Sequence, residues 1–156
     1  MARQVFFSFH YLPDVSRAGI VRNAWVTHHK KPFIDWADWE EVRKSSEISI
    51  KRWIDKQLEG SSVTVVLIGA ETSTRKYVKY EIQKSYEKGN GLVGIYVNSL
   101  KDFNKQISIR GANPFANFSV NGKGLDTMVR TYDWISDNGY QNIGNWVESA
   151  AKAVGR

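Results

Sequence analysis

The amino-acid sequence predicts an α/β fold, in which a central, mainly parallel sheet lies between two layers of helices. Short β-rich segments alternate along the chain with segments of helical spacing, which is the pattern of parallel strands joined by crossover helices. Residues 62–69 are apolar almost without interruption, as expected for a strand covered on both faces. A length of 156 residues is typical of one domain, and we expect residues 1–156 to form a single one.

The first part of the chain contains two predicted strands with a helix between them. Residues 5–9 are aromatic and β-rich, which favours a strand. A helix is expected over residues 14–28, because apolar side chains recur there at helical spacing and Asp14 is suited to its N-cap. Residues 33–36 predict a second, very short strand.

The middle of the chain predicts two further helices around the apolar strand at 62–69. Ser46 is suited to the N-cap of the first, and Gly60 to its end. The second is expected over residues 74–88, after three hydroxyl residues that can cap its start. The apolar stripe of the first helix consists of Ile50, Trp53, Ile54 and Leu58, and the candidate caps of the second are Thr72, Ser73 and Thr74.

The last part of the chain predicts two strands, a long loop and a final helix. Alternating apolar residues favour a strand at 92–97, and a last strand is expected at 129–135. Between them, residues 98–128 are rich in Asn, Gly, Ser and Lys, so we expect a long loop region, which in compact domains is often functional. The C-terminal helix is expected over residues 139–155.

This order of elements also predicts where a ligand would bind. In open parallel sheets, ligands bind beyond the carboxyl ends of the strands. Here the chain leaves the predicted strands at residues 9–11, 35–39, 69–74 and 98–101.

Composition excludes several kinds of site. The absence of cysteine rules out disulfides, thiol nucleophiles, thiolate zinc sites and iron–sulfur clusters. No apolar stretch approaches the length of a membrane span, so we expect a cytoplasmic protein without a membrane contact. The net charge of +6 suggests nucleic acid as a partner, but acidic residues interrupt the basic ones on the predicted helices. Nucleic acid is therefore not an expected partner.

Two motifs that resemble ligand sites have simpler explanations. Adjacent His28 and His29 point about 100° apart on a helix, and no third ligand accompanies them, so no metal site is expected. Residues 89–94 match the glycine fingerprint of dinucleotide sites by letters. A helix precedes them and a strand follows, the reverse of what that fingerprint requires, so they are interpreted as a helix cap.

The segment around Glu81 carries the most chemical information. Tyr77 and Glu81 are four residues apart and share one face of the predicted 74–88 helix. This helix follows the end of a strand, so the carboxylate can reach the mouth of a cleft and the aromatic ring can stack on a ligand. The alternative interpretation is an ordinary solvated glutamate among four neighbouring basic residues, Arg75, Lys76, Lys79 and Lys84.

A resemblance to a known family joins these motifs. Residues 5–9, 33–35 and 73–81 resemble, in order, the first-strand box, the second-strand box and the third-helix motif of Toll/interleukin-1 receptor (TIR) domains. The likeness is closest to the TIR-like subunit of the bacterial Thoeris antiphage system, in residues 5–11, 63–69, 77–82, 87–90 and 113–115. It implies a TIR-like, flavodoxin-like three-layer sandwich with a central, mainly parallel sheet of about five strands.

The resemblance also implies an activity and its residues. The family cleaves the nicotinamide–ribose bond of NAD+ and produces a cyclic or modified ADP-ribose signal. By position in the motif, Glu81 corresponds to the catalytic glutamate, and Tyr77 stands where the family often has Trp. The expected substrate-binding residues are Phe9, His10, Tyr11, Asp35, Trp39 and Tyr77.

The partners follow from the same resemblance. NAD+ would be a substrate, with no other cofactor and no metal, and the product would activate a separate effector protein in antiphage defence. A phage-derived trigger and self-association are both compatible with activation. Three alternatives stay open: a TIR-like adaptor that acts only by protein–protein docking, a nucleic-acid binder, and another N-glycosidic enzyme such as a nucleoside deoxyribosyltransferase.

Overall fold

The computed structural model describes residues 3–29 and 44–156, and its centre is a parallel sheet. Four described strands follow the order β1-β2-β3-β6, and every neighbouring pair is parallel. They are β1 (Val5–Ser8), β2 (Val63–Ile68), β3 (Gly91–Tyr96) and β6 (Thr131–Asp133). The mainly parallel α/β sheet is thus confirmed. The fifth strand, predicted at residues 33–36, lies outside the described residues.

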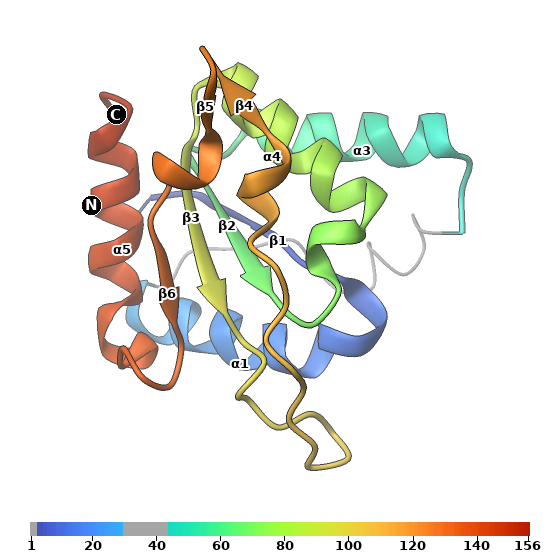
Figure 1. Ribbon diagram of the computed structural model, residues 1–156, viewed down its shortest axis with the longest axis vertical. Coiled ribbons are helices and arrows are strands. Elements are labelled where there is room, and N and C mark those ends of the chain that lie inside the picture. Colours follow the sequence, from blue (N-terminus) through green and yellow to red (C-terminus); the bar gives the residue numbers. More distant parts are fainter. Residues whose placement is uncertain (1–2, 30–43) are drawn as a thin grey trace.

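Helices cover both faces of this sheet, as Figure 1 shows. One face is covered by α1 (Tyr11–His29) and α5 (Gly139–Ala153). Their apolar side chains join alternate residues of β1, β2 and β3 in the largest core cluster, in which Trp25 and Ile143 are fully buried. Because successive strand residues point to opposite faces, the remaining strand residues face the other layer of helices.

The other face is covered by α4 (Lys76–Lys88) and, beside it, α3 (Glu47–Glu59). Val78 and Ile82 of α4 pack against β2 and β3, while the stripe predicted for the preceding helix packs Ile50, Ile54 and Leu58 against Phe6 of β1. The two helices are also joined by a hydrogen bond of 2.7 Å from the Tyr80 hydroxyl to Asp55 Oδ1. This helix pair therefore holds α4 over the end of β1.

Most helix boundaries agree with the predicted caps. Ser46 is the N-cap of α3, where its Oγ accepts a hydrogen bond from Ser49 N at 3.3 Å, and Gly60 ends that helix. Gly89 ends α4 in the left-handed conformation (φ 86°), which a residue without Cβ adopts easily. The helix-cap interpretation therefore holds for Gly89, whereas Gly91 and Gly94 lie within β3.

Two predicted helix starts are wrong. α1 begins at Tyr11, so Asp14 lies within its first turn and is not the N-cap. α4 begins at Lys76, and Arg75 occupies its N-cap without a side-chain hydrogen bond. The three hydroxyl residues instead form the short helical turn η1 (Thr72–Thr74). Asp14 and Thr72 instead contact Gly69, at the end of β2, as described below.

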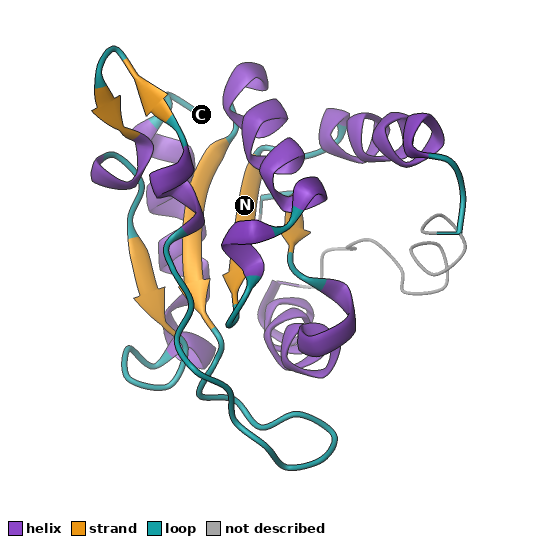
Figure 2. Cartoon of the chain, turned by 45° about the vertical axis from the view of Figure 1, so that its right-hand side comes forward, coloured by secondary structure: helices purple, strands orange, loops and turns teal. Residues whose placement is uncertain are grey.

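The region predicted as one long loop has two parts. Residues 97–113 contain neither helix nor strand and project beyond the ends of the strands, as Figure 2 shows. The rest holds short elements: η2 (Pro114–Asn117), β4 (Ser119–Val120), β5 (Lys123–Gly124) and η3 (Leu125–Thr127). β4 and β5 form a small antiparallel hairpin. The last strand, predicted at 129–135, is shorter and includes only the three residues of β6.

Candidate active site

Glu81 is a buried carboxyl group on the sheet-facing side of α4. Only 6% of the residue is exposed, so the interpretation as an ordinary solvated glutamate is wrong. The buried residues of this helix follow one another at helical spacing, and Glu81 is one of them. They are Val78, Glu81, Ile82 and Ser85. A carboxyl group thus takes a position on this face that an apolar residue normally fills.

Burial governs the protonation of this group. It raises the pKa of the Glu81 carboxyl from an ordinary 4.5 to about 8, because the carboxylate loses its hydration. The Ser8 hydroxyl opposes this effect and lowers the pKa, although Ser8 Oγ is not within hydrogen-bond geometry of any described residue. In the free protein Glu81 is therefore mostly protonated at neutral pH. A cation placed beside it would favour the carboxylate.

The influence of Ser8 also locates Glu81 in the fold. Ser8 is the last residue of β1 and completely buried, and it points to the same face as Phe6, which packs against α3. Glu81 consequently lies at the carboxyl end of β1. This is the edge of the sheet where ligands bind in folds of this class.

His10 follows in the turn between β1 and α1. Its pKa is lowered mainly by burial and further by the positive charge of Arg75, while Asp14 and Glu71 act in the opposite direction. Its Nδ1 is buried and has no hydrogen-bond partner among the described residues. Since Arg75 immediately precedes α4, the turn after β1 lies near the start of the helix that carries Glu81.

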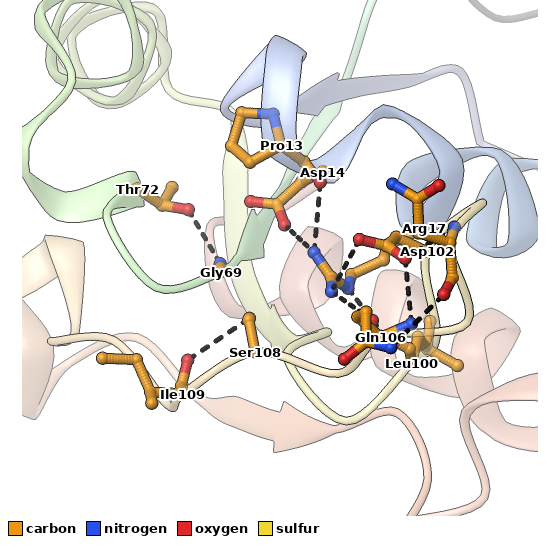
Figure 3. Close-up of polar contacts among 11 residues, drawn as sticks. Pro13, Asp14, Arg17, Gly69, Thr72, Leu100, Asp102, Gln106, Ser108 and Ile109 are labelled. Atoms are coloured by element: carbon orange, nitrogen blue, oxygen red, sulfur yellow. Dashed lines mark hydrogen bonds and ion pairs between the residues drawn. The ribbon is translucent and has the colours of Figure 1, made fainter.

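The turn after β2 lies at the same carboxyl edge of the sheet. Thr72 Oγ1 accepts a hydrogen bond of 2.7 Å from Gly69 N, which holds η1 against the end of β2 (Figure 3). The Asp14 carboxylate lies directly against Gly69, where a Cβ atom would overlap it, so glycine is required at this close approach. Burial raises the pKa of Asp14, and Arg17 opposes that effect.

The structure places the residues expected to bind substrate in different surroundings. Phe9 and Tyr11 are half-buried on either side of His10, with ring centroids 6.2 Å apart. The half-buried Tyr77 packs beside α3, and Lys76 Nζ lies 5.5 Å from its ring centroid. Asp35 and Trp39 lie outside the described residues. The substrate-binding roles of all these residues stay predictions.

Ser8, Arg17 and Asn98 were not predicted as site residues, although all three lie at this edge. Ser8 Oγ and Asn98 Oδ1 are buried without a hydrogen-bond partner in the described part of the chain. Ser8 has a detectable signal, because strand alternation places this lone hydroxyl on the face shared with Phe6. Asn98 comes just after β3, and only the fold shows that it and Ser8 border one edge.

Three other features of the described residues concern metal clusters, membrane-spanning helices and grooves. Among residues 3–29 and 44–156, no group of three or more His, Asp or Glu could hold a metal ion. No helix in the same residues has the length and apolar character to cross a membrane. A groove of about 230 Å³ lies between α5, β3 and β6, lined in part by Arg130, Tyr132 and Trp146. It lacks a carboxylate and includes none of the predicted site residues.

The parallel sheet between two layers of helices is the architecture of a TIR-like domain, and a family model agrees with it. The chain belongs to the family of the Thoeris protein ThsB, TIR-like domain, whose family model matches residues 6–102. The matched segment includes β2, β3, α4 and all of β1 except Val5, and therefore Ser8 and Glu81.

One curated relative supports this membership, and one solved structure shares the fold. A protein of Bacillus cereus (strain MSX-D12) named "Putative cyclic ADP-D-ribose synthase ThsB1" is 36% identical, and the alignment covers 94% of this chain and 100% of that protein. The crystal structure of the IL-17 receptor B SEFIR domain is similar with a TM-score of 0.55, over 97% of this chain and 96% of that one. At 10% identity, the second likeness shows the fold alone.

Proposed function

We propose that this protein cleaves the nicotinamide–ribose bond of NAD+ and produces a cyclic or modified ADP-ribose. The burial of Glu81 at the carboxyl end of β1 is the observation that carries the proposal. Placing a carboxyl group under a helix is costly, and such perturbed groups concentrate at functional sites. The name of the 36% identical relative supports the same reaction class.

The chemistry needs one carboxylate of this kind. When the bond between nicotinamide and ribose breaks, its electron pair leaves with nicotinamide and positive charge develops on the ribosyl carbon. A fixed carboxylate in a water-poor site stabilises that charge. The nicotinamide ring of NAD+ is itself cationic, so bound substrate would lower the pKa of Glu81 and convert it to the carboxylate.

The Ser8 hydroxyl and the His10 imidazole complete the proposed site. Both present buried polar atoms without partners in the described structure, which suits them to hydroxyl or phosphate groups of a nucleotide. The half-buried rings of Phe9, Tyr11 and Tyr77 border the same elements and offer surfaces for stacking. We further propose that the product activates a separate effector protein in antiphage defence, in the cytoplasm.

The central test is Glu81→Gln, with Glu87→Gln as the matched control. Glu87 lies on the same helix but is exposed, where it pairs with Lys84 at 3.6 Å and accepts a hydrogen bond from Gln83 Nε2 at 3.4 Å. We expect Glu81→Gln to reduce nicotinamide release by about a hundredfold or more, with unchanged circular dichroism, and Glu87→Gln to retain activity. The assay uses purified protein and lysates of cells with and without phage infection.

The same assay separates the alternatives. Undiminished nicotinamide release by Glu81→Gln would show that this residue is not the catalytic group. Release of a base from free nucleosides but not from NAD+ would indicate a different N-glycosidic enzyme. Signalling by Glu81→Gln in phage-infected cells without any nucleotide product would favour the docking adaptor.

A further inference from the structure

Arg17 of α1 is a buried cation that holds a distant loop. Only 3% of the residue is exposed, and its guanidinium group donates four hydrogen bonds. Its Nε donates to Leu100 O at 2.7 Å and its Nη2 to Gln106 O at 2.8 Å, so both carbonyls belong to the irregular segment after β3. Figure 3 shows the guanidinium group between this loop and the start of α1.

The remaining bonds tie the loop to the candidate site. Arg17 Nη1 donates to Pro13 O at 3.1 Å and to Asp14 Oδ1 at 2.9 Å. The other oxygen of Asp14 lies against Gly69, at the end of β2. The pair of Arg17 and Asp14 thus joins the first turn of α1, the end of β2 and the loop after β3, all at the edge where Glu81 lies.

The loop itself is an ordered turn. Asp102 Oδ1 accepts hydrogen bonds from the amides of Asn104, at 2.8 Å, and Gln106, at 2.9 Å. Asp102 Oδ2 also lies 3.9 Å from Arg17 Nη2. Ser108 N donates to Asn98 O at 2.9 Å, which closes the base of the turn.

Contacts at the far end fix the return of the loop. The Arg110 guanidinium carbon lies 3.7 Å from the ring centroid of Tyr96, the last residue of β3. Gly111 passes so close to the carbonyls of Gly69 and Ala70 that a Cβ atom there would overlap them. The loop is therefore held at both ends across the carboxyl edge of the sheet, and it presents large apolar side chains, Phe103, Ile107 and Ile109, on its exposed part.

A buried arginine is an expensive way to hold a loop, because desolvation of its charge opposes the gain from pairing. This desolvation cost is consistent with a role in which the position of the loop matters more than the stability of the fold. After nicotinamide leaves, the ribosyl carbon bonds either to an atom of the same ADP-ribose, giving a cyclic product, or to the oxygen of water, giving linear ADP-ribose. In both cases the attacking group releases its proton to solvent. Exclusion of water favours the cyclic product.

We propose that Arg17 is a positioning residue that holds the 98–111 loop as the wall of the substrate cleft, and that this wall favours cyclisation over hydrolysis. The inference rests on the proposed cleavage of NAD+. It concerns which group bonds to the ribosyl carbon after nicotinamide has left, whereas Glu81 concerns the cleavage of the nicotinamide–ribose bond. The ratio of linear to cyclic product is therefore its direct measure, and this ratio does not depend on how much of the protein is active.

Three variants of the full chain test the proposal. Arg17→Lys keeps a positive charge beside Asp14 but cannot reach both loop carbonyls with a planar group. Asp102→Ala loosens the turn from the loop side, and it leaves no unpaired charge in the core because Arg17 keeps its ion pair with Asp14, at 2.9 Å. Arg3→Lys is the matched control, since Arg3 makes a bidentate contact with Glu148, at 3.1 and 2.9 Å, and precedes β1 at the opposite end of the sheet.

Mass spectrometry of nucleotides gives the product ratio, and hydrogen exchange reports the order of the loop. We expect Arg17→Lys and Asp102→Ala to raise the linear-to-cyclic ratio roughly three- to tenfold, the equivalent of one hydrogen bond, and to speed exchange at Gln106 and Ser108. Arg3→Lys should change neither. If Arg17→Lys does not fold, Asp102→Ala decides.

The outcomes separate this inference from the proposed function. An unchanged ratio in Arg17→Lys and Asp102→Ala, despite faster exchange of the loop, would overturn the role of the wall and leave NAD+ cleavage standing. Only linear product from the wild-type chain would do the same. Failure of the wild-type chain to release nicotinamide in any lysate would instead reject the proposed function, and this inference with it.

Discussion

The two ends of the parallel sheet differ in whether their buried polar groups have hydrogen-bond partners. At the amino ends of β2 and β3 they form a closed network. Asn90 Nδ2 donates to Ser61 Oγ at 2.9 Å and to Thr64 Oγ1 at 3.3 Å, and Thr64 Oγ1 lies 2.6 Å from Ser85 Oγ. Lys88 Nζ donates to Ser61 O and to Asn90 Oδ1, at 2.6 and 3.1 Å.

At the carboxyl ends of the strands, buried polar atoms without hydrogen-bond partners in the described residues gather instead. They include Ser8 Oγ, His10 Nδ1, Asp14 Oδ2 and Asn98 Oδ1. Unmade hydrogen bonds in a low-dielectric site are costly, so such groups persist mainly where they serve another purpose. The contrast is consistent with a stabilising role for the amino end, and it supports the proposal that a ligand binds at the carboxyl end.

The largest expected effect concerns the pH dependence of catalysis. The pKa of Glu81 in the free protein is about 8, so kcat/KM for NAD+ should rise with pH and level off above that value. Well below it, kcat/KM should fall about tenfold per pH unit, because only the carboxylate stabilises the developing charge. A profile that is flat across this range, measured by nicotinamide release, would contradict the role of Glu81.

The next largest effect is expected from breaking the closed network. Asn90→Ala removes both the donor and the acceptor of a side chain that is 2% exposed. It should lower the free energy of unfolding by about 2 kcal/mol, because buried hydroxyl and ammonium groups lose their partner. Thermal unfolding followed by circular dichroism should show a Tm lower by roughly 4–8 °C. Activity per folded molecule should stay at the wild-type level, since Asn90 is remote from the site.

An effect that is smaller per pH unit links Glu81 to stability. Its pKa is raised from 4.5 in the unfolded chain to about 8 in the folded protein, so between these values the unfolded state binds fewer protons. The contribution of Glu81 to stability is therefore complete below the lower value and decreases as pH rises toward the upper one. The slope is at most about 1.4 kcal/mol per pH unit.

Comparison with Glu81→Gln isolates this contribution, because glutamine does not titrate. The free energy of unfolding in urea should decline less steeply with pH in the variant than in the wild type. Parallel curves for the two proteins would mean that the Glu81 carboxyl is not protonated in the folded state.

The smallest effect on stability is expected at the end of β1. Ser8→Ala should change the free energy of unfolding by less than about 0.5 kcal/mol, because Ser8 Oγ has no hydrogen-bond partner among the described residues. Ser85→Ala, which removes a buried hydroxyl from the closed network, should cost about 1 kcal/mol. Ser8→Ala should also shift the pH profile of kcat/KM to higher pH, since this hydroxyl lowers the pKa of Glu81. If Ser8→Ala and Ser85→Ala lost equal stability, the proposed difference between the two ends of the sheet would be wrong.

Much of the fold was predictable because local pattern and tertiary packing agree. The apolar run at 62–69 became the central strand β2, and Ser46 and Gly89 ended helices as their chemistry suggests. Predictions of helix caps failed where the side chain instead contacts a residue that is distant along the chain. Asp14 was expected to cap a helix, but it pairs with Arg17 and lies against Gly69. Thr72 was expected to cap α4, but it binds the backbone of Gly69.

The sequence by itself determined the layers of the fold, the order of the elements and the position of Glu81 in a recognisable motif, because these depend on periodicity and spacing along the chain. Tertiary structure decided that this glutamate is buried and that its pKa is raised. It also decided that Arg17 meets the loop after β3, more than eighty residues away. Desolvation and long-range hydrogen bonds depend on which surfaces the fold brings together, and one-dimensional spacing does not contain that information.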